Sequence, residues 1–324
     1  MSHSSCSFNS SNVFEYGNYK TTLLSIKAKE DGFCSRRSSS TTDSVSPPKP
    51  VLVGRPETDE GGEFPVLILL HGFMTPNDFY SQLIRHVASY GFIVVAPQLH
   101  SIATTDATGD VEAAAAITDW LSNRSLQSFL PSNICPIVTK LALSGHSRGG
   151  KAAFALALSK TESFSALIGI DPVDGTTFSQ TPPPVLTGVP SSFQLGGIPV
   201  MMIGSGLGAE KKNRISCACA PKGVNHEAFY KECQSPACYF VAKDYGHMDM
   251  LDDDTKGMIG KMTYVMCKNG ESREPMRKFV GGVLVAFLKA YLEGDDSDLV
   301  AIRNGEVELP VQLDAVDFRL SVPA

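Results

Sequence analysis

The amino-acid sequence predicts an α/β fold in which helices cover both faces of a mostly parallel central sheet. The first observation is a set of short, almost uninterrupted apolar runs, such as residues 64–70 and 166–170, which are typical of strands buried on both faces. The second is that segments with helical spacing, such as 79–90 and 151–158, separate these runs. Alternating strands and helices favour a parallel sheet.

The elements follow one another from residue 64 onward. We predict strands at 64–70, 92–96, 141–143, 166–170, 198–203 and 239–242, and helices at 79–90, 111–122, 151–158 and 276–292. Two long irregular stretches are expected, at 172–197, which is rich in proline and glycine, and at about 204–236. Long loops above a rigid sheet usually build the binding pocket.

The chain is expected to consist of two regions. Residues 1–50 read as a variable Ser/Pro-rich segment, with an early strand within 13–26 and a surface loop or linker at 35–50, and residues 51–324 as a single α/β domain. The serine-rich start has two interpretations, part of a plastid transit peptide or a disordered tail. No apolar run reaches the roughly 18 residues that a transmembrane helix needs.

Composition excludes some functions and leaves the state of the cysteines open. A net charge of −6 argues against a general nucleic-acid or anionic-membrane binder. Five of the eight cysteines lie between residues 217 and 267, without a C-x-x-C pair at zinc spacing. We favour reduced or incidental thiols, and the alternative is one or two disulfides in an excursion near the active site.

The segment Gly145-His146-Ser147-Arg148-Gly149 matches the pattern G-x-S-x-G. The pattern places a nucleophilic serine on a strained strand-to-helix turn, where side chains at the glycine positions would collide with their neighbours. An apolar strand is predicted directly before it and a helix directly after it, which disfavours a bystander serine in a glycine-rich turn. We therefore predict an α/β-hydrolase fold with Ser147 as the nucleophile.

Two backbone N–H groups are expected to form the oxyanion hole. His71-Gly72-Phe73 follows the strand at 64–70, and in this architecture that loop donates one N–H, which we assign to Phe73. Arg148, directly after the nucleophile, supplies the other. His71 is expected to tie the loop to the sheet, and His146 to pack or hydrogen-bond beneath the turn.

The general base should lie on the loop after the last parallel strand. His247 follows the strand at 239–242 by a short loop and is the leading candidate, whereas the alternative, His226, has no strand immediately before it. The remaining histidines, His3, His86 and His100, are expected on the surface or in loops.

The acid is less routine, because the usual position after the strand at 198–203 holds Gly204-Ser205-Gly206-Leu207-Gly208, without a carboxylate. The preceding strand ends in Asp171, which is the leading candidate, and Asp174 is the alternative. The order Ser147, Asp171, His247 agrees with that of α/β-hydrolases. Asp249 and residues 252–254 are expected to form an acidic N-terminal cap for the following helix.

These residues resemble those of the plant chlorophyllase family. The resemblance rests on residues 145–151, 168–175, 204–208, 244–249 and 267–270, and it covers about residues 12–293. It implies that the family's nucleophile, acid and base fall on Ser147, Asp171 and His247, which favours Asp171 over Asp174.

The resemblance also implies a reaction and a partner. The family cleaves the phytyl ester of chlorophyll to chlorophyllide and phytol through an acyl-enzyme. No metal or organic cofactor is implied, since the magnesium belongs to the substrate. Chlorophyll would be the hydrophobic partner, with a chloroplast location and peripheral contact with plastid membranes. The cytosol or another endomembrane is the alternative location. A lipase-like carboxylesterase and a non-catalytic pigment-binding protein remain the alternatives.

Overall fold

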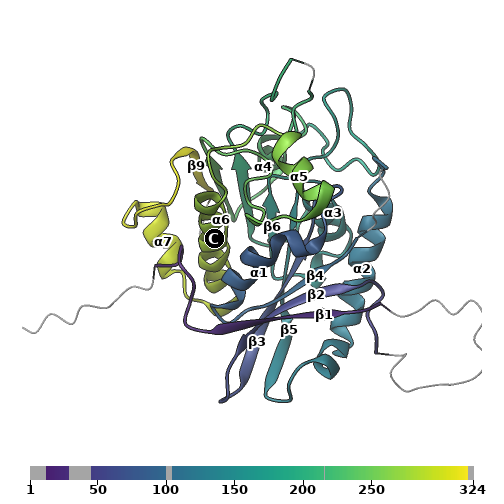
Figure 1. Cartoon of the computed structure of the whole chain (residues 1–324), viewed down its shortest axis with the longest axis vertical. Coiled ribbons are helices and arrows are strands. Elements are labelled where there is room, and N and C mark those ends of the chain that lie inside the picture. Colours follow the sequence, from purple (N-terminus) through teal and green to yellow (C-terminus); the bar gives the residue numbers. More distant parts are fainter. Residues whose placement is uncertain (1–11, 29–44, 100–103, 215, 320–324) are drawn as a thin grey trace, which may run out of the picture.

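The computed structural model describes residues 12–28, 45–99, 104–214 and 216–319. Within this part of the chain, a nine-stranded sheet runs through the molecule in the order β1-β2-β4-β3-β5-β6-β7-β8-β9 (Figure 1). Its strands are β1 (Lys20–Ile26), β2 (Val51–Glu57), β3 (Gly62–Leu70), β4 (Ile93–Pro97), β5 (Ile134–His146), β6 (Ala166–Ile170), β7 (Val200–Ser205), β8 (Ala237–Ala242) and β9 (Leu313–Arg319). The strands from β4 to β8 are mutually parallel, which confirms the predicted mostly parallel sheet.

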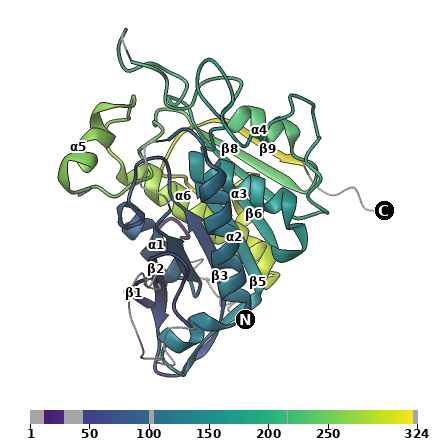
Figure 2. The same cartoon turned by 90° about the vertical axis from the view of Figure 1, so that its right-hand side faces the viewer.

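Helices cover both faces of this sheet, as predicted (Figure 2). One face packs against α2 (Thr108–Ser122), α3 (Arg148–Ser159) and α4 (His226–Glu232), and the other against α1 (Ser81–Ala88), α6 (Glu274–Leu288) and α7 (Ser297–Asn304). A further helix, α5 (Gly257–Val265), stands apart from these two layers. Short 3-10 turns occur at Asn77–Tyr80, Ser125–Phe129 and Thr161–Ser163, and a π-helical turn at Lys289–Glu293.

The central elements lie where the sequence predicts them, and the outer ones differ. The early strand begins only at Lys20, because Val13 and Phe14 are buried beside α6 instead of joining the sheet. The helix predicted at 79–90 divides into a 3-10 turn and α1. The stretch 204–236 contains α4, which was not predicted. Residues 35–44 of the expected linker, His3 and His100 lie outside the described residues.

No helix within the described ranges is long and apolar enough to cross a bilayer.

Candidate active site

Ser147 occupies a sharp turn between β5 and α3. Its backbone has φ 56° and ψ −121°, a region that non-glycine residues rarely adopt. The flanking glycines are required sterically: a Cβ at Gly145 would lie 2.2 Å from the Gly149 carbonyl oxygen, and one at Gly149 would lie 2.4 Å from the Leu70 oxygen. The turn therefore brings β5, α3 and β3 closer together than side chains would permit.

Three side chains from separate strand ends form a chain of hydrogen bonds beside this turn. His247 Nε2 lies 2.8 Å from Ser147 Oγ, and His247 Nδ1 lies 2.7 Å from Asp171 Oδ2. Ser147 follows β5, Asp171 follows β6, and His247 lies on the loop after β8, so the parallel sheet gathers all three at its carboxyl edge. This is the arrangement of a nucleophile, a base and a base-orienting acid.

Asp171 is fully buried and receives hydrogen bonds from more than one side chain. Ser205 Oγ donates to the same Oδ2 that accepts from His247. Burial alone would raise the pKa of Asp171, but the hydrogen bond and charge of His247, the nearby His226 and the Ser205 hydroxyl outweigh it and lower the pKa to about 2. The carboxylate is therefore ionised at neutral pH.

Ser205 was missed at the sequence level. It lies in the glycine-rich segment 204–208, at the strand end where an acid is usual, and its hydroxyl bonds Asp171, which follows the neighbouring strand. The only feature of the sequence that pointed to Ser205 was the absence of a carboxylate from the segment 204–208.

The two alternative candidates have other partners. Asp174 forms an ion pair with Lys151 and accepts hydrogen bonds from the N–H groups of Val185 and Leu186, so it organises the loop after β6. His226 Nδ1 lies 2.8 Å from the Tyr239 hydroxyl, and its Nε2 lies 3.8 Å from Asp171 Oδ1. His226 thus stands behind the acid rather than beside Ser147, and its burial lowers its pKa.

The two expected oxyanion donors flank the serine. Phe73, Ser147 and Arg148 line one small cavity of about 210 Å³. Among the described residues, no acceptor is bonded to the N–H of Phe73 or of Arg148, and the latter N–H lies in the first turn of α3. The Arg148 guanidinium points to α2 instead, where it pairs with Asp110 and bonds the carbonyls of Thr104 and Asp106.

Two neutral histidines connect the loops of the site. His71 Nε2 accepts the Leu99 N–H at 2.8 Å, as expected for a residue that ties its loop to the sheet. His146 lies beneath the turn and bonds the Tyr80 hydroxyl at 2.7 Å and the His247 carbonyl at 2.9 Å. Burial lowers the pKa of His146 to about 3, so it remains neutral and its bonding directions are fixed.

The acidic residues after His247 do not cap the following helix, so that prediction is wrong. Asp249 instead accepts the N–H groups of Gly246 and Gly270 and shapes the loop that carries His247. Asp252 accepts the N–H groups of Ser81 and Gln82 and so caps α1, which is distant in sequence. The chain reverses after His247 and brings these carboxylates to earlier elements.

The expectation of a surface or loop position for His86 is also wrong. This residue is buried in α1, and its Nε2 bonds the Val13 carbonyl at 2.8 Å. The segment around Val13 packs over His86, and the spacing of apolar residues in α1 could not predict this contact.

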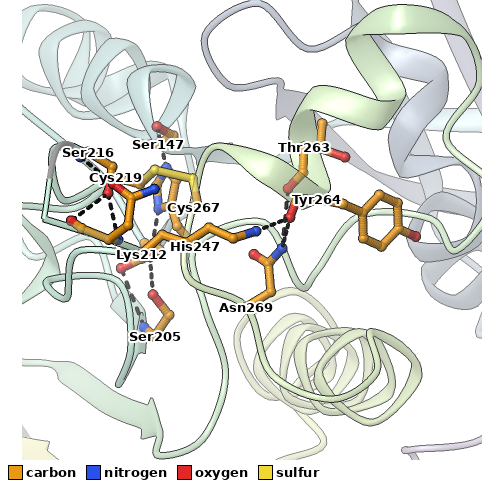
Figure 3. The surroundings of a disulfide bond; sticks show 12 residues. Ser147, Ser205, Lys212, Ser216, Cys219, His247, Thr263, Tyr264, Cys267 and Asn269 are labelled. Carbon is orange, nitrogen blue, oxygen red and sulfur yellow. Dashed lines mark hydrogen bonds and ion pairs between the residues drawn. A yellow bond between two sulfur atoms is a disulfide. The ribbon is translucent and has the colours of Figure 1, made fainter.

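The favoured interpretation of the cysteines is wrong as well, because Cys219 and Cys267 form a disulfide (Figure 3). Four other cysteines within the described residues are free, at 135, 217, 233 and 238. The disulfide joins two loops that are 48 residues apart in sequence, and Cys219 lines a cavity that Ser147 also lines. No sequence spacing specified this pairing, which the fold brings within 5.7 Å between Cα atoms.

A larger cavity of about 460 Å³ opens beside Ser147 and His247. Its walls are mostly apolar and come from the loop after β3, the loop between β7 and α4, and α5 with the residue after it. The side chains from the last of these are Ile259, Met262, Thr263, Val265 and Met266. Ser147 therefore faces a space suited to an extended apolar group.

Comparison with known proteins identifies a family for nearly the whole length of this chain. A family model described as Chlorophyllase matches residues 9–320. Chlorophyllase-2 of Arabidopsis thaliana is 54% identical over 314 residues, which cover 95% of this chain and 97% of the relative. Chlorophyllase-1 of the same plant is 43% identical over 93% of this chain and 91% of its own length. A relative from Citrus unshiu named "Chlorophyllase-1, chloroplastic" is 42% identical over 94% of this chain and 88% of its own length. The chain therefore belongs to the chlorophyllase family.

Proposed function

We propose that this protein hydrolyses the phytyl ester of chlorophyll to chlorophyllide and phytol, with Ser147 as nucleophile, His247 as base and Asp171 as acid. The observation that carries the proposal is the hydrogen-bonded chain from Ser147 to Asp171 at the wall of an apolar cavity. The names of the relatives supply the substrate.

The reaction follows from the positions of the atoms. As Ser147 Oγ attacks the ester carbonyl, His247 Nε2 takes its proton, and Asp171 stabilises the imidazolium. The N–H groups of Phe73 and Arg148 would receive the oxyanion, each contributing roughly 3–4 kcal/mol. Collapse of the intermediate expels phytol, which takes the proton from His247. Water, activated by His247, then releases chlorophyllide from Ser147.

Location belongs to the same proposal. Two citrus relatives, 42% and 41% identical to this chain, are named chloroplastic. We place the protein in the plastid, where its lipid-soluble substrate would bring it into contact with membranes.

The test is incubation of the purified protein with detergent-solubilised chlorophyll a, followed by chromatographic detection of chlorophyllide. We expect Ser147→Ala, His247→Ala and Asp171→Asn to lower kcat by at least about 10³-fold. Asp254→Asn, which changes an exposed carboxylate just beyond the His247 loop, should leave kcat unchanged. Wild-type turnover of p-nitrophenyl esters without turnover of chlorophyll would contradict the substrate, and near-normal activity of Asp171→Asn would contradict the acid.

A further inference from the structure

A surface helix usually buries its apolar side and exposes its polar side, and helix α5 does the opposite. Here the buried positions are Gly260 and Thr263. The apolar side chains point outward: Met258 is 81% exposed and Val265 is 65% exposed. Ile259, Met262 and Met266 are exposed as well. Contiguous exposed apolar side chains of this kind mark a surface that meets another phase or partner.

The polar contacts beneath α5 fix this orientation. Thr263 Oγ1 donates to the Gly260 carbonyl at 2.6 Å and accepts from the buried Arg273 at 2.8 Å. A Cβ at Gly260 would lie 2.2 Å from the Thr255 carbonyl oxygen, so only glycine permits the close approach. Turning the helix inward would break these hydrogen bonds and bury larger side chains where no room exists. The outward apolar face is therefore part of the folded structure.

The exposed face is continuous with the wall of the large cavity. Ile259, Met262 and Met266 are both exposed and cavity-lining, and Met74, from the loop after β3, is likewise exposed and lines the same cavity. An apolar group that lay against α5 could thus pass to Ser147 without crossing a polar surface.

Basic side chains lie beside this face, although the chain as a whole is acidic. Lys256 and Lys261 are exposed on α5 and beside it, and within the described residues neither forms an ion pair. Lys212, from the loop that precedes Cys219, donates to the Tyr264 carbonyl at the outer end of α5 (Figure 3). Arg214 is exposed two residues further on. Two exposed carboxylates, Asp253 and Asp254, precede the helix, and Asp253 pairs with Arg277. Lys256 and Lys261, which lie beside the apolar face, fit the headgroup layer above acyl chains.

We infer that α5 is a docking surface for a lipid bilayer, with its apolar face in the outer acyl layer and its lysines among the headgroups. The bilayer is the occupant that matches both the apolar face and the basic side chains beside it. Docking itself is independent of the proposed function. Only its consequence rests on that function, namely that a membrane-borne ester reaches Ser147 through the cavity mouth beside α5.

The test is flotation of the full-length protein with vesicles of phosphatidylcholine, alone or mixed with phosphatidylglycerol. Met258→Asp should lower vesicle binding by about tenfold or more, because burying one methionine side chain is worth roughly 1.5–3 kcal/mol. Val316→Asp is the matched control, since Val316 is a half-exposed apolar residue on β9 and lies outside this face. Lys261→Glu should weaken binding mainly to the mixed, anionic vesicles.

Activity assays separate this inference from the proposed function. Met258 does not line the cavity, so Met258→Asp should hydrolyse p-nitrophenyl butyrate and detergent-solubilised chlorophyll at the wild-type rate but vesicle-bound chlorophyll more slowly. Equal flotation of Met258→Asp and wild type would overturn the docking surface. So would a wild-type dimer in sedimentation that Met258→Asp dissociates, because a second copy would then cover the face. Flotation without chlorophyll hydrolysis would leave docking standing and remove the proposed function.

Discussion

Several side chains contact the carboxylate of Asp171 and fix its position. Its Oδ2 accepts from both His247 and Ser205, and His226 stands 3.8 Å from its Oδ1. Because Asp171 follows β6, two of the side chains around its carboxylate, Ser205 and His226, come from the next two elements along the chain, β7 and α4. The geometry of His247 thus depends on residues that do not line the cavity beside Ser147.

Ser205→Ala removes one of these supports and tests its role. A hydrogen bond to a charged group contributes roughly 1.5–3 kcal/mol, and we expect part of this loss to lower kcat/KM by about tenfold. The pKa of Asp171 should also rise, so the acidic limb of the pH profile of kcat/KM should move to higher pH. The measurement is kcat/KM across pH. Ser165→Ala, which changes a serine just before β6, is the control. If Ser205→Ala leaves the pH profile of kcat/KM as unchanged as this control does, Ser205 does not position Asp171.

Ser147 and His247 could be proposed as candidates from the sequence because each follows an apolar run at a definite distance, and the structure brings His247 Nε2 within 2.8 Å of Ser147 Oγ. Asp171 and Asp174 are three residues apart on one loop, and only the backbone turn at Asp171, with φ 44°, directs one to His247 and leaves the other to Lys151. Ser205 and the Cys219–Cys267 pair depend on contacts between distant segments, for which a single sequence carries no spacing rule.

At the scale of elements, α1 is capped by a residue from the other end of the domain. Asp252 accepts the N–H groups of Ser81 and Gln82, which have no carbonyl partner within the helix. Loss of a capping side chain typically costs about 1 kcal/mol. The loop that carries His247 and the start of α1 are therefore coupled.

We accordingly expect Asp252→Ala to lower the free energy of unfolding by about 1–2 kcal/mol, as measured by urea denaturation. Asp254→Ala alters the same loop at an exposed position and should change stability by less than about 0.5 kcal/mol. Equal effects of the two substitutions would show that the cap has no energetic role.

The strands that the sequence did not reveal are those at the sheet margins. β2 contains Gly54 and Pro56, and β9 alternates acidic and apolar residues with most positions partly exposed. The first half of β5 is likewise only partly buried and contains Pro136 and Lys140. A strand with one covered face, or one interrupted by glycine and proline as β2 is, gives no continuous apolar run, so pattern analysis detects the centre of such a sheet better than its borders.

At the scale of the whole molecule, buried histidines set the response to acid. Burial lowers the pKa of His86, His146 and His226 below the ordinary value of 6.5. Below about pH 6.5 the unfolded chain therefore binds more protons than the folded one. The free energy of unfolding is unaffected by these groups above that pH and decreases as the pH falls below it. For His146, with a pKa of about 3, the loss at pH 5 is about 2 kcal/mol.

His86→Gln tests this effect away from the active site. The glutamine amide retains a donor for the Val13 carbonyl but does not titrate. We expect the variant to lose less stability than the wild type between pH 7 and pH 5, as measured by urea unfolding at both values. A parallel loss in the two proteins would assign the acid sensitivity to other groups.

The strand β9 has a consequence for how the protein is made. β8 and β9 are neighbours in the sheet, yet α5, α6 and α7 lie between them in the sequence. Until β9 has been synthesised, the apolar β8 presents an open edge of unpaired backbone groups, which is a template for association with other chains. The nascent chain therefore needs protection of that edge after most of the active site has already been translated.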